Sequence, residues 1–354
     1  MTQNDVSVTL PEALQTIAST WRRPNGHETV FSLVGEPGIG KSALFGPLKT
    51  DVCPSFGILP ERSFMRNVSH WDTPDYDGIP DVSGDWCQWK PPAIFHALRA
   101  GTGPALLVLD EAAGDLSIAQ QNALCKVIYD RRLGDIQLTD PLYIVLTGNR
   151  TGDKSGANRL STKLGNRMVQ LTIAFDQAAW EAWAHEHGVG ADIIAFHRWK
   201  ADTTDGGTSS AFGFDPNRSI NPTPRAWAEM ADSIDRSLPS SLYLRVLAGC
   251  VTLGPATEFV AFQQYWKDLP AIEAVWVNPT ELPLPTALQG QYALALYVAS
   301  LVQPGVATQF FTLVQRLPNM LRVPTVMAAT KRCPGLVGTA AFSQWAIANP
   351  QILF

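Results

Sequence analysis

The stretch VFSLVGEPGIGKSALFGPLK, residues 30–49, decides the fold that we predict for this chain of 354 residues. Its first five residues form an apolar run with the length of a buried strand, and residues 35–42 match the pattern G-x-x-x-x-G-K-[ST]. The residues after Ser42 can begin a helix. Strand, glycine-rich loop and helix in this order predict a phosphate-binding loop, because the glycines let backbone N–H groups and the helix N-terminus face phosphate oxygens.

The last residues of this loop have the chemistry for a nucleoside triphosphate. Lys41 can reach the β- and γ-phosphates, and the Ser42 hydroxyl can bind a Mg²⁺ ion that bridges them. A glycine-rich turn before an ordinary helix is the alternative interpretation. We expect ATP and Mg²⁺ as cofactors, with a nucleotide-binding loop formed by Gly35, Glu36, Pro37, Gly38, Ile39, Gly40, Lys41, Ser42 and Ala43.

A second apolar run, ALLVL at residues 105–109, leads directly into Asp110 and Glu111. A carboxylate at the C-terminal end of a neighbouring parallel strand lies beside the phosphate loop. We expect Asp110 to bind Mg²⁺ together with Ser42, and Glu111 to polarise the attacking water, since phosphoryl transfer needs a positioned nucleophile and charge neutralisation. Alone, two acids after a strand describe a solvated strand end equally well, but the preceding loop favours the catalytic interpretation.

Two further apolar runs, LYIVL at residues 142–146 and VQLTI at residues 169–173, follow along the chain. All four runs are continuous rather than alternating, which predicts strands buried on both faces, with crossover helices in the segments between them. The first half of the chain is therefore predicted to be an α/β domain with a parallel sheet. From Asp176, which can cap a helix, the sequence becomes helical.

The composition indicates a globular protein with packed cores. Hydrophobic residues make up 45% and charged residues 17% of the chain. The net charge of −5 argues against binding of nucleic acid or anionic membranes by overall electrostatic attraction. The apolar run at residues 292–302 is shorter than the roughly 20 residues that span a bilayer, and the opening residues lack a signal-peptide layout. We expect a cytoplasmic protein without a membrane partner, and nucleic acid is disfavoured as a partner.

The third apolar run leads into Asn149, which puts a short polar amide where the sheet edge meets the γ-phosphate. Phosphate loop, acid pair, Asn149, LGNRM (164–168) and NPTPRAW (221–227) occur in the order seen in AAA+ ATPases, and the chain most resembles their MoxR branch, in a subgroup common in bacteria and phages. The resemblance implies that Asn149 orients the lytic water as the sensor-1 residue. It also implies an arginine finger at Arg167, a sensor-2 arginine at Arg225 and a second residue for contact in trans at Arg159. Without the family resemblance, each of these arginines is a candidate for a surface salt bridge.

The same resemblance implies an organisation and an activity. The expected domains are an AAA+ nucleotide-binding core over residues 1–175, an α-helical lid over 176–245 and a helical C-terminal extension over 246–354, with a hairpin before the third apolar run. The expected activity is Mg²⁺-dependent hydrolysis of ATP. The expected assembly is a homo-oligomer, a hexameric ring that remodels or assembles a protein client. A protein with a von Willebrand factor A domain is one of the partners that the resemblance implies. The alternatives are a nucleic-acid motor or DNA-bound regulator, and a nucleotide-gated binding module with little turnover.

Two pairs of side chains allow both a functional and a structural interpretation. Trp86 and Trp89 lie between the loop and the acid pair, where ring ATPases carry loops that contact substrate. Contact with a client and packing within an inserted hairpin are the two interpretations. His185 and His187 lie two residues apart on a predicted helix and face different directions, so we expect surface histidines rather than a metal site.

Overall fold

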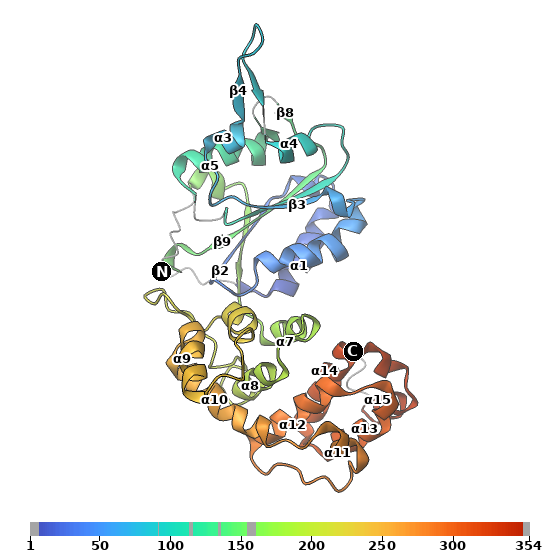
Figure 1. Cartoon of the computed structure of the whole chain (residues 1–354). Coiled ribbons are helices and arrows are strands. Elements are labelled where there is room, and N and C mark those ends of the chain that lie inside the picture. Colours follow the sequence, from blue (N-terminus) through green and yellow to red (C-terminus); the bar gives the residue numbers. More distant parts are fainter. Residues whose placement is uncertain (1–6, 91, 113–115, 134–135, 154–160, 350–354) are drawn as a thin grey trace. The chain divides into compact units, whose positions relative to one another are not determined.

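The computed structural model describes residues 7–90, 92–112, 116–133, 136–153 and 161–349 (Figure 1). The chain divides into two compact units. Unit 1 consists of Met1–Phe175 together with Asp215–Arg218, and unit 2 consists of Asp176–Phe214 and Ser219–Phe354. The separation of a lid at 176–245 from an extension at 246–354 stays a prediction. In the part of the chain that the structure describes, no helix has the length and apolar character needed to cross a membrane.

Unit 1 is built around a parallel sheet of six strands in the order β1-β10-β2-β9-β6-β3. The four predicted runs form β2, β6, β9 and β10, so the α/β fold with a parallel sheet is confirmed. The sequence prediction missed β3, because SFMRN contains only two apolar side chains. The strands are β1 (Ser7–Val8), β2 (Phe31–Gly35), β3 (Ser63–Asn67), β6 (Ala105–Asp110), β9 (Leu142–Asn149) and β10 (Val169–Ile173).

Helices cover both faces of this sheet (Figure 1). One face packs against α1 (Leu10–Trp21) and the helical segment after the glycine-rich loop. The other packs against α3 (Thr73–Asp77), α4 (Ala93–Ala97) and α5 (Ile118–Cys125). Burial on both faces explains why β2, β6 and β9 are continuous apolar runs.

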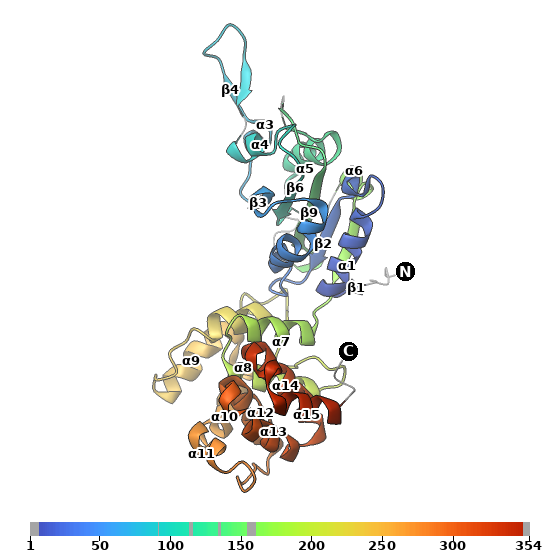
Figure 2. The same ribbon diagram turned by 90° about the vertical axis from the view of Figure 1, so that its right-hand side faces the viewer.

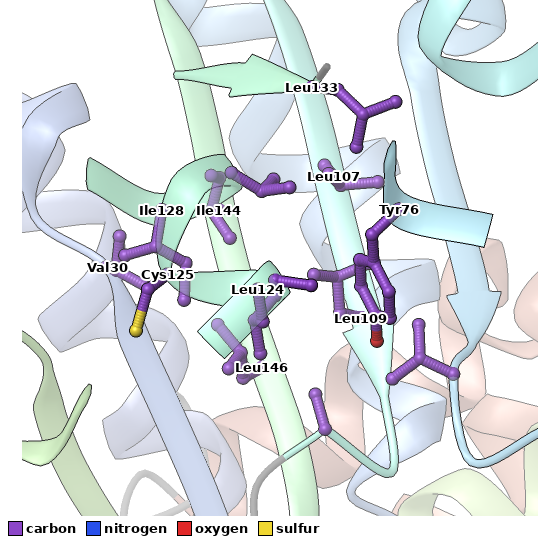
Figure 3. Close-up of a cluster of buried hydrophobic side chains, with 14 of the residues drawn as sticks. Val30, Tyr76, Leu107, Leu109, Leu124, Cys125, Ile128, Leu133, Ile144 and Leu146 are labelled. Atoms are coloured by element: carbon purple, nitrogen blue, oxygen red, sulfur yellow. The ribbon is translucent and has the colours of Figure 1, made fainter. Parts of the chain in front are cut away.

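Successive residues of the central strands belong to opposite cores. In β6, Leu107 and Leu109 join the cluster shown in Figure 3, whereas Leu106 and Val108 join the cluster on the other face. The prediction of burial on both faces was wrong for the first half of β10, where Val169 is 41% exposed. Among the described residues β1 pairs with the last two residues of β10, Thr172 and Ile173, so no described strand lies beside the first half of β10 on that edge.

Two antiparallel hairpins extend unit 1. The hairpin of β7 (Arg132–Leu133) and β8 (Ile136–Gln137) precedes β9, as expected. The hairpin of β4 (Ile79–Asp81) and β5 (Gln88–Lys90) points away from the sheet in both views (Figures 1 and 2). The interpretation that its tryptophans pack within the hairpin was wrong, because Trp86 is 81% and Trp89 45% exposed.

Unit 2 is helical in its described residues, and the Asp176 carboxylate caps its first helix by accepting the Ala179 N–H at 3.0 Å, as predicted. Aromatic side chains fill the core around Phe196, and His197 stacks on Phe212 with 3.9 Å between ring centroids. The α-helices are α7 (Gln177–Glu186), α8 (Ala191–Asp202), α9 (Ser240–Val251), α10 (Leu253–Lys267), α11 (Ile272–Val277), α12 (Leu288–Leu301), α13 (Ala307–Arg316), α14 (Asn319–Arg332) and α15 (Ala340–Ala348).

The two histidines of α7 differ in environment. His187 is exposed as predicted, but His185 is buried, so its prediction as a surface residue was wrong. The helical spacing that separates the two side chains turns His185 toward α14, where Arg332 donates from Nε to its Nδ1 at 3.1 Å. Burial lowers the pKa of His185 to about 4, with the positive charge of Arg332 acting in the same direction.

This burial makes the stability of the protein depend on pH. Between pH 6.5 and 4 the unfolded chain binds a proton at residue 185 that the folded chain does not, so stability falls as the pH drops through this range. We expect His185→Gln, which keeps an acceptor for Arg332, to lose less stability than the wild type between pH 7.5 and pH 5. The difference is about 2 kcal/mol. Urea unfolding at both pH values measures it, with His187→Gln as the control, and a pH dependence in His185→Gln equal to that of the wild type contradicts this account.

Candidate nucleotide-binding and catalytic site

The glycine-rich loop leaves the sheet at the C-terminal end of β2. Gly38 and Gly40 have φ values of +77° and +97°, a conformation that residues with a Cβ rarely adopt. At Gly35 the constraint is space, since a Cβ there lies 2.9 Å from the carbonyl oxygen of Ile173 in β10. The loop can therefore turn tightly at the strand end only because these positions are glycines.

Lys41 lies inside this loop, with 7% of its surface exposed. Its Nζ donates to the carbonyl oxygens of Gly35 at 2.8 Å and Glu36 at 2.7 Å. It also donates to Oδ1 of Asn149 at 3.1 Å. The ammonium group is thus held between the loop and the end of β9, although Lys41 and Asn149 are 108 residues apart.

The helix expected after Ser42 is present but irregular. Residues 42–56 run through a 3₁₀ turn, the short α2 (Phe45–Pro47), a π turn at Leu48–Val52 and a second 3₁₀ turn at Cys53–Phe56. Pro47 and Pro54 lack an N–H group, and Gly46 favours helix weakly, so a single regular hydrogen-bond pattern is not maintained. The segment still packs Leu44, Leu48 and Val52 into the core beneath the sheet.

Asp110, at the end of β6, faces the same loop. Its Oδ1 accepts a hydrogen bond from the Ser42 hydroxyl at 2.7 Å and another from the Thr147 hydroxyl. A hydroxyl and a carboxylate are oxygen donors of the kind that Mg²⁺ prefers. The residues expected to bind the metal therefore lie together and fit a Mg²⁺ ion in their chemistry.

Strand order explains how these residues meet. β9 lies between β2 and β6, and its last residue, Asn149, pairs in register with Gly35. Because the strands are parallel, their C-terminal ends form one edge of the sheet. Lys41, Ser42, Asp110 and Asn149 are brought to this edge by three strands that are far apart in the sequence.

Glu111 comes directly after β6 and is partly exposed. Its φ is +59°, a value that costs a residue with a side chain roughly 1 kcal/mol or more. Within the described residues, its carboxylate makes no hydrogen bond or ion pair. The backbone at Glu111 therefore departs from the strand conformation directly after the end of β6.

Sequence reasoning missed two residues at this edge, Thr147 and Arg150, although both belong to the TGNR motif around Asn149. Arg150 donates from Nη2 to the Glu36 carboxylate at 2.8 Å and forms an ion pair with Asp153 at 3.1 Å. Burial alone lowers the pKa of Arg150, but the two carboxylates outweigh it and raise the pKa. Arg150 thus ties the end of β9 to the second residue of the loop.

The three arginines implied by the family resemblance are placed differently. Arg167 is exposed, two residues before β10, with its Cζ 4.2 Å from the centroid of the Tyr129 ring. Arg225 belongs to unit 2, where its side chain is 54% exposed and 3.8 Å from Glu229. Arg159 lies outside the described residues. The roles of all three stay predictions.

Arg167 lies at the edge of the sheet opposite the glycine-rich loop. The first residue of β10, Val169, pairs with Phe31 at the start of β2, whereas the loop begins at Gly35. Four residue steps along a strand span about 13 Å. Arg167 therefore lies at the far end of the sheet from the glycine-rich loop of its own chain.

No family model and no curated protein matches this sequence. Solved structures with similarity include PCH-2 from C. elegans, at 15% identity over 81% of this chain and 67% of that chain, with a TM-score of 0.34. NtrX from Brucella abortus in complex with ATP has 15% identity over 74% and 66%, with a TM-score of 0.35. The HORMA:CdnC:Trip13 complex from E. coli MS115-1 has a chain with 14% identity over 74% and 83%, also at 0.35. The chain's own sheet order and loop define its fold as an α/β P-loop core followed by a helical part.

Two substitutions separate binding from turnover at this site. We expect Lys41→Ala to abolish binding of a fluorescent ATP analogue, because it removes the ammonium group from the phosphate loop. Glu111→Gln is expected to bind the analogue but to release phosphate about 10²-fold to 10⁴-fold more slowly, since it spares the loop and removes the carboxylate that we expect to act as the base. Lys267→Ala, at an exposed lysine of α10, is the control. Wild-type phosphate release by Glu111→Gln removes Glu111 from the mechanism.

Proposed function

We propose that this chain is an AAA+ ATPase that couples hydrolysis of ATP to the remodelling or assembly of a protein client. The observation that carries the proposal is the meeting of Lys41, Ser42, Asp110 and Asn149 at the C-terminal edge of a parallel sheet. These groups combine a phosphate-binding loop, oxygen ligands for a divalent ion and a polar amide. Their combination suits attack of water on a terminal phosphate better than simple storage of a nucleotide.

Each group has a distinct task in ATP + water → ADP + phosphate. Loop N–H groups and Lys41 hold the β- and γ-phosphates, and Asn149 orients the attacking water. Glu111 accepts the proton of that water. Ser42 and Asp110 would hold Mg²⁺, which neutralises charge on the phosphates when it is bound.

We infer that the active unit is a homo-oligomeric ring, hexameric by the MoxR resemblance. Arg167 supports this inference because it is exposed, lies over the ring of Tyr129 and is at the opposite end of the strands from the glycine-rich loop of its own chain. An arginine in this place can serve as a finger only for a neighbouring subunit. Arg225 is proposed to contact the nucleotide from the helical lid, and a von Willebrand factor A protein is the proposed partner type by resemblance alone.

Mixing two inactive variants tests the shared site. We expect Arg167→Ala to bind the ATP analogue normally and to hydrolyse ATP about 10³-fold more slowly, in the range seen when an arginine finger is lost. Mixed with Glu111→Gln, it should recover part of the activity, because some interfaces then join an intact Glu111 to an intact Arg167. Arg66→Ala, at another exposed arginine, is the control for Arg167→Ala. Subunit exchange without any recovery contradicts a site shared between subunits.

The β4–β5 hairpin supports a protein client over a nucleic acid. It exposes Ile79, Val82, Trp86 and Trp89, which gives an apolar surface at the end of unit 1. Its acids include Asp81, which is paired with Lys90 and whose pKa is lowered to about 2 chiefly by that hydrogen bond. Nucleic acid requires positive charge at the contact, whereas exposed apolar side chains with few cations suit a polypeptide. For this reason a nucleic-acid motor is only the second candidate function.

Capture of the client tests this part of the proposal. We expect Glu111→Gln with ATP to retain a protein from a lysate of the source cells, identified by mass spectrometry. Adding Trp86→Ser should reduce the captured amount at least about fivefold, since one exposed aromatic anchor contributes about 1 kcal/mol or more. The control adds Val277→Ser, which removes an apolar side chain that is 84% exposed in unit 2.

The response of the ATPase rate to DNA tests the alternative of a nucleic-acid motor. At physiological salt we expect neither single-stranded nor double-stranded DNA to change the ATPase rate of the wild type. Stimulation of more than about tenfold by DNA alone, equivalent to about 1.4 kcal/mol in the barrier, supports the nucleic-acid motor instead.

A further inference from the structure

We propose that Thr147 is a positioning residue for Asp110, which it holds in the orientation needed to bind Mg²⁺. The inference rests on the proposed ATPase function and deepens it, because it assigns a role to a residue that the phosphate-loop and acid-pair motifs do not include. It is carried by one hydrogen bond, the burial of Thr147 and the geometry of the two neighbouring strands.

Thr147 and Asp110 are adjacent across the pairing of β9 with β6. Leu109 and Leu146 are partners in register, so the next residue of each strand is Asp110 and Thr147. Thr147 is 2% exposed, and its hydroxyl donates to Oδ1 of Asp110. A buried hydroxyl needs a hydrogen-bond partner, and here the partner is the acid that ends the next strand.

Two hydroxyl groups occupy the same carboxylate oxygen. Ser42 donates to Oδ1 from the loop at 2.7 Å, and Thr147 donates to it from β9. These two bonds use the acceptor positions of Oδ1. Among the described residues Oδ2 makes no hydrogen bond or ion pair, so it is the oxygen that Asp110 can offer to a cation.

The two donors are not equivalent. Ser42 lies in the glycine-rich loop and is itself expected to bind the metal, so its bond to Asp110 changes with the ligand. Thr147 lies in a buried strand, and its β-branched side chain has restricted rotation about χ1. The terminal torsion of an aspartate is broad and roughly two-fold. A rigid donor on one oxygen therefore selects one orientation of the Asp110 carboxylate before the metal binds.

The experiment measures binding, so that it does not depend on turnover. Affinity for a fluorescent ATP analogue is determined in EDTA and over a titration of Mg²⁺, for the wild type and for Thr147→Val, which keeps the shape of the side chain. We expect unchanged affinity in EDTA and a Mg²⁺ concentration for half-maximal enhancement that rises about tenfold or more, since loss of a group that orients a metal ligand weakens metal binding 10- to 100-fold. Thr147→Ser should restore the wild-type value.

Thr139→Val is the matched control, because Thr139 is also buried and donates its hydroxyl to the Gly103 carbonyl oxygen at 2.6 Å, away from Asp110. If Thr147→Val does not fold, Thr147→Ala and Thr147→Ser form the test pair. Both lack the methyl group and only the serine keeps the hydroxyl, so we expect the Mg²⁺ shift in the alanine variant alone.

The outcomes distinguish the two levels of inference. Weaker analogue binding by Thr147→Val to the same degree in EDTA and in Mg²⁺, or no change at all, overturns the positioning role and leaves the proposed ATPase function in place. A wild-type protein that binds no ATP analogue, or binds it without regard to Mg²⁺, overturns the proposed function and the role of Thr147 with it.

Discussion

The placement of β9 between β2 and β6 is the constraint on which the rest of the site depends. Parallel pairing sets Asn149 level with Gly35 and puts Thr147 beside Asp110. β9 sets β2 and β6 two strand spacings apart, about 10 Å, and at this separation Ser42 from the loop and Thr147 from β9 both donate to one oxygen of Asp110. Two backbone ladders, β2 with β9 and β9 with β6, therefore set the distance between the glycine-rich loop and Asp110.

The apolar character of these strands serves both the fold and the site. Each central strand buries side chains on both faces, so polar residues can be accommodated mainly where a strand ends. Asp110 and Asn149 are the last residues of β6 and β9, and both are partly buried. Thr147 lies two residues inside the edge and is buried, and its hydroxyl is satisfied by Asp110. The transition from apolar core to polar edge thus occurs within three residues of β9.

Features that depend on local pattern were predictable from the sequence, whereas features that depend on pairing were not. The loop, the four apolar runs and the Asp176 cap were read correctly because spacing and residue type determine them. β3 was missed because it is an edge strand that is only partly buried and therefore contains few apolar residues. The exposure of the first half of β10 accompanies its place next to the edge of the sheet, and the burial of His185 accompanies its contact with Arg332 of α14, 147 residues away. The sequence motifs identified Asn149 but not Thr147, because only the register between β9 and β6 shows that Thr147 lies beside Asp110.

The distribution of positive charge in unit 1 is the physical basis for proposing that the site is shared between subunits. Lys41 lies in the phosphate loop, but Arg150, close to the loop through Glu36, is already engaged by two carboxylates. Its charge is compensated before any phosphate arrives. Arg167 is exposed and free of carboxylate partners among the described residues, yet it lies at the opposite edge of the sheet. Charge that develops on a γ-phosphate beyond the reach of Lys41 and a metal ion is therefore best met from outside this unit. The proposed ring provides a second copy of the chain for this purpose, because Arg167 and the glycine-rich loop of one chain lie at opposite ends of the strands.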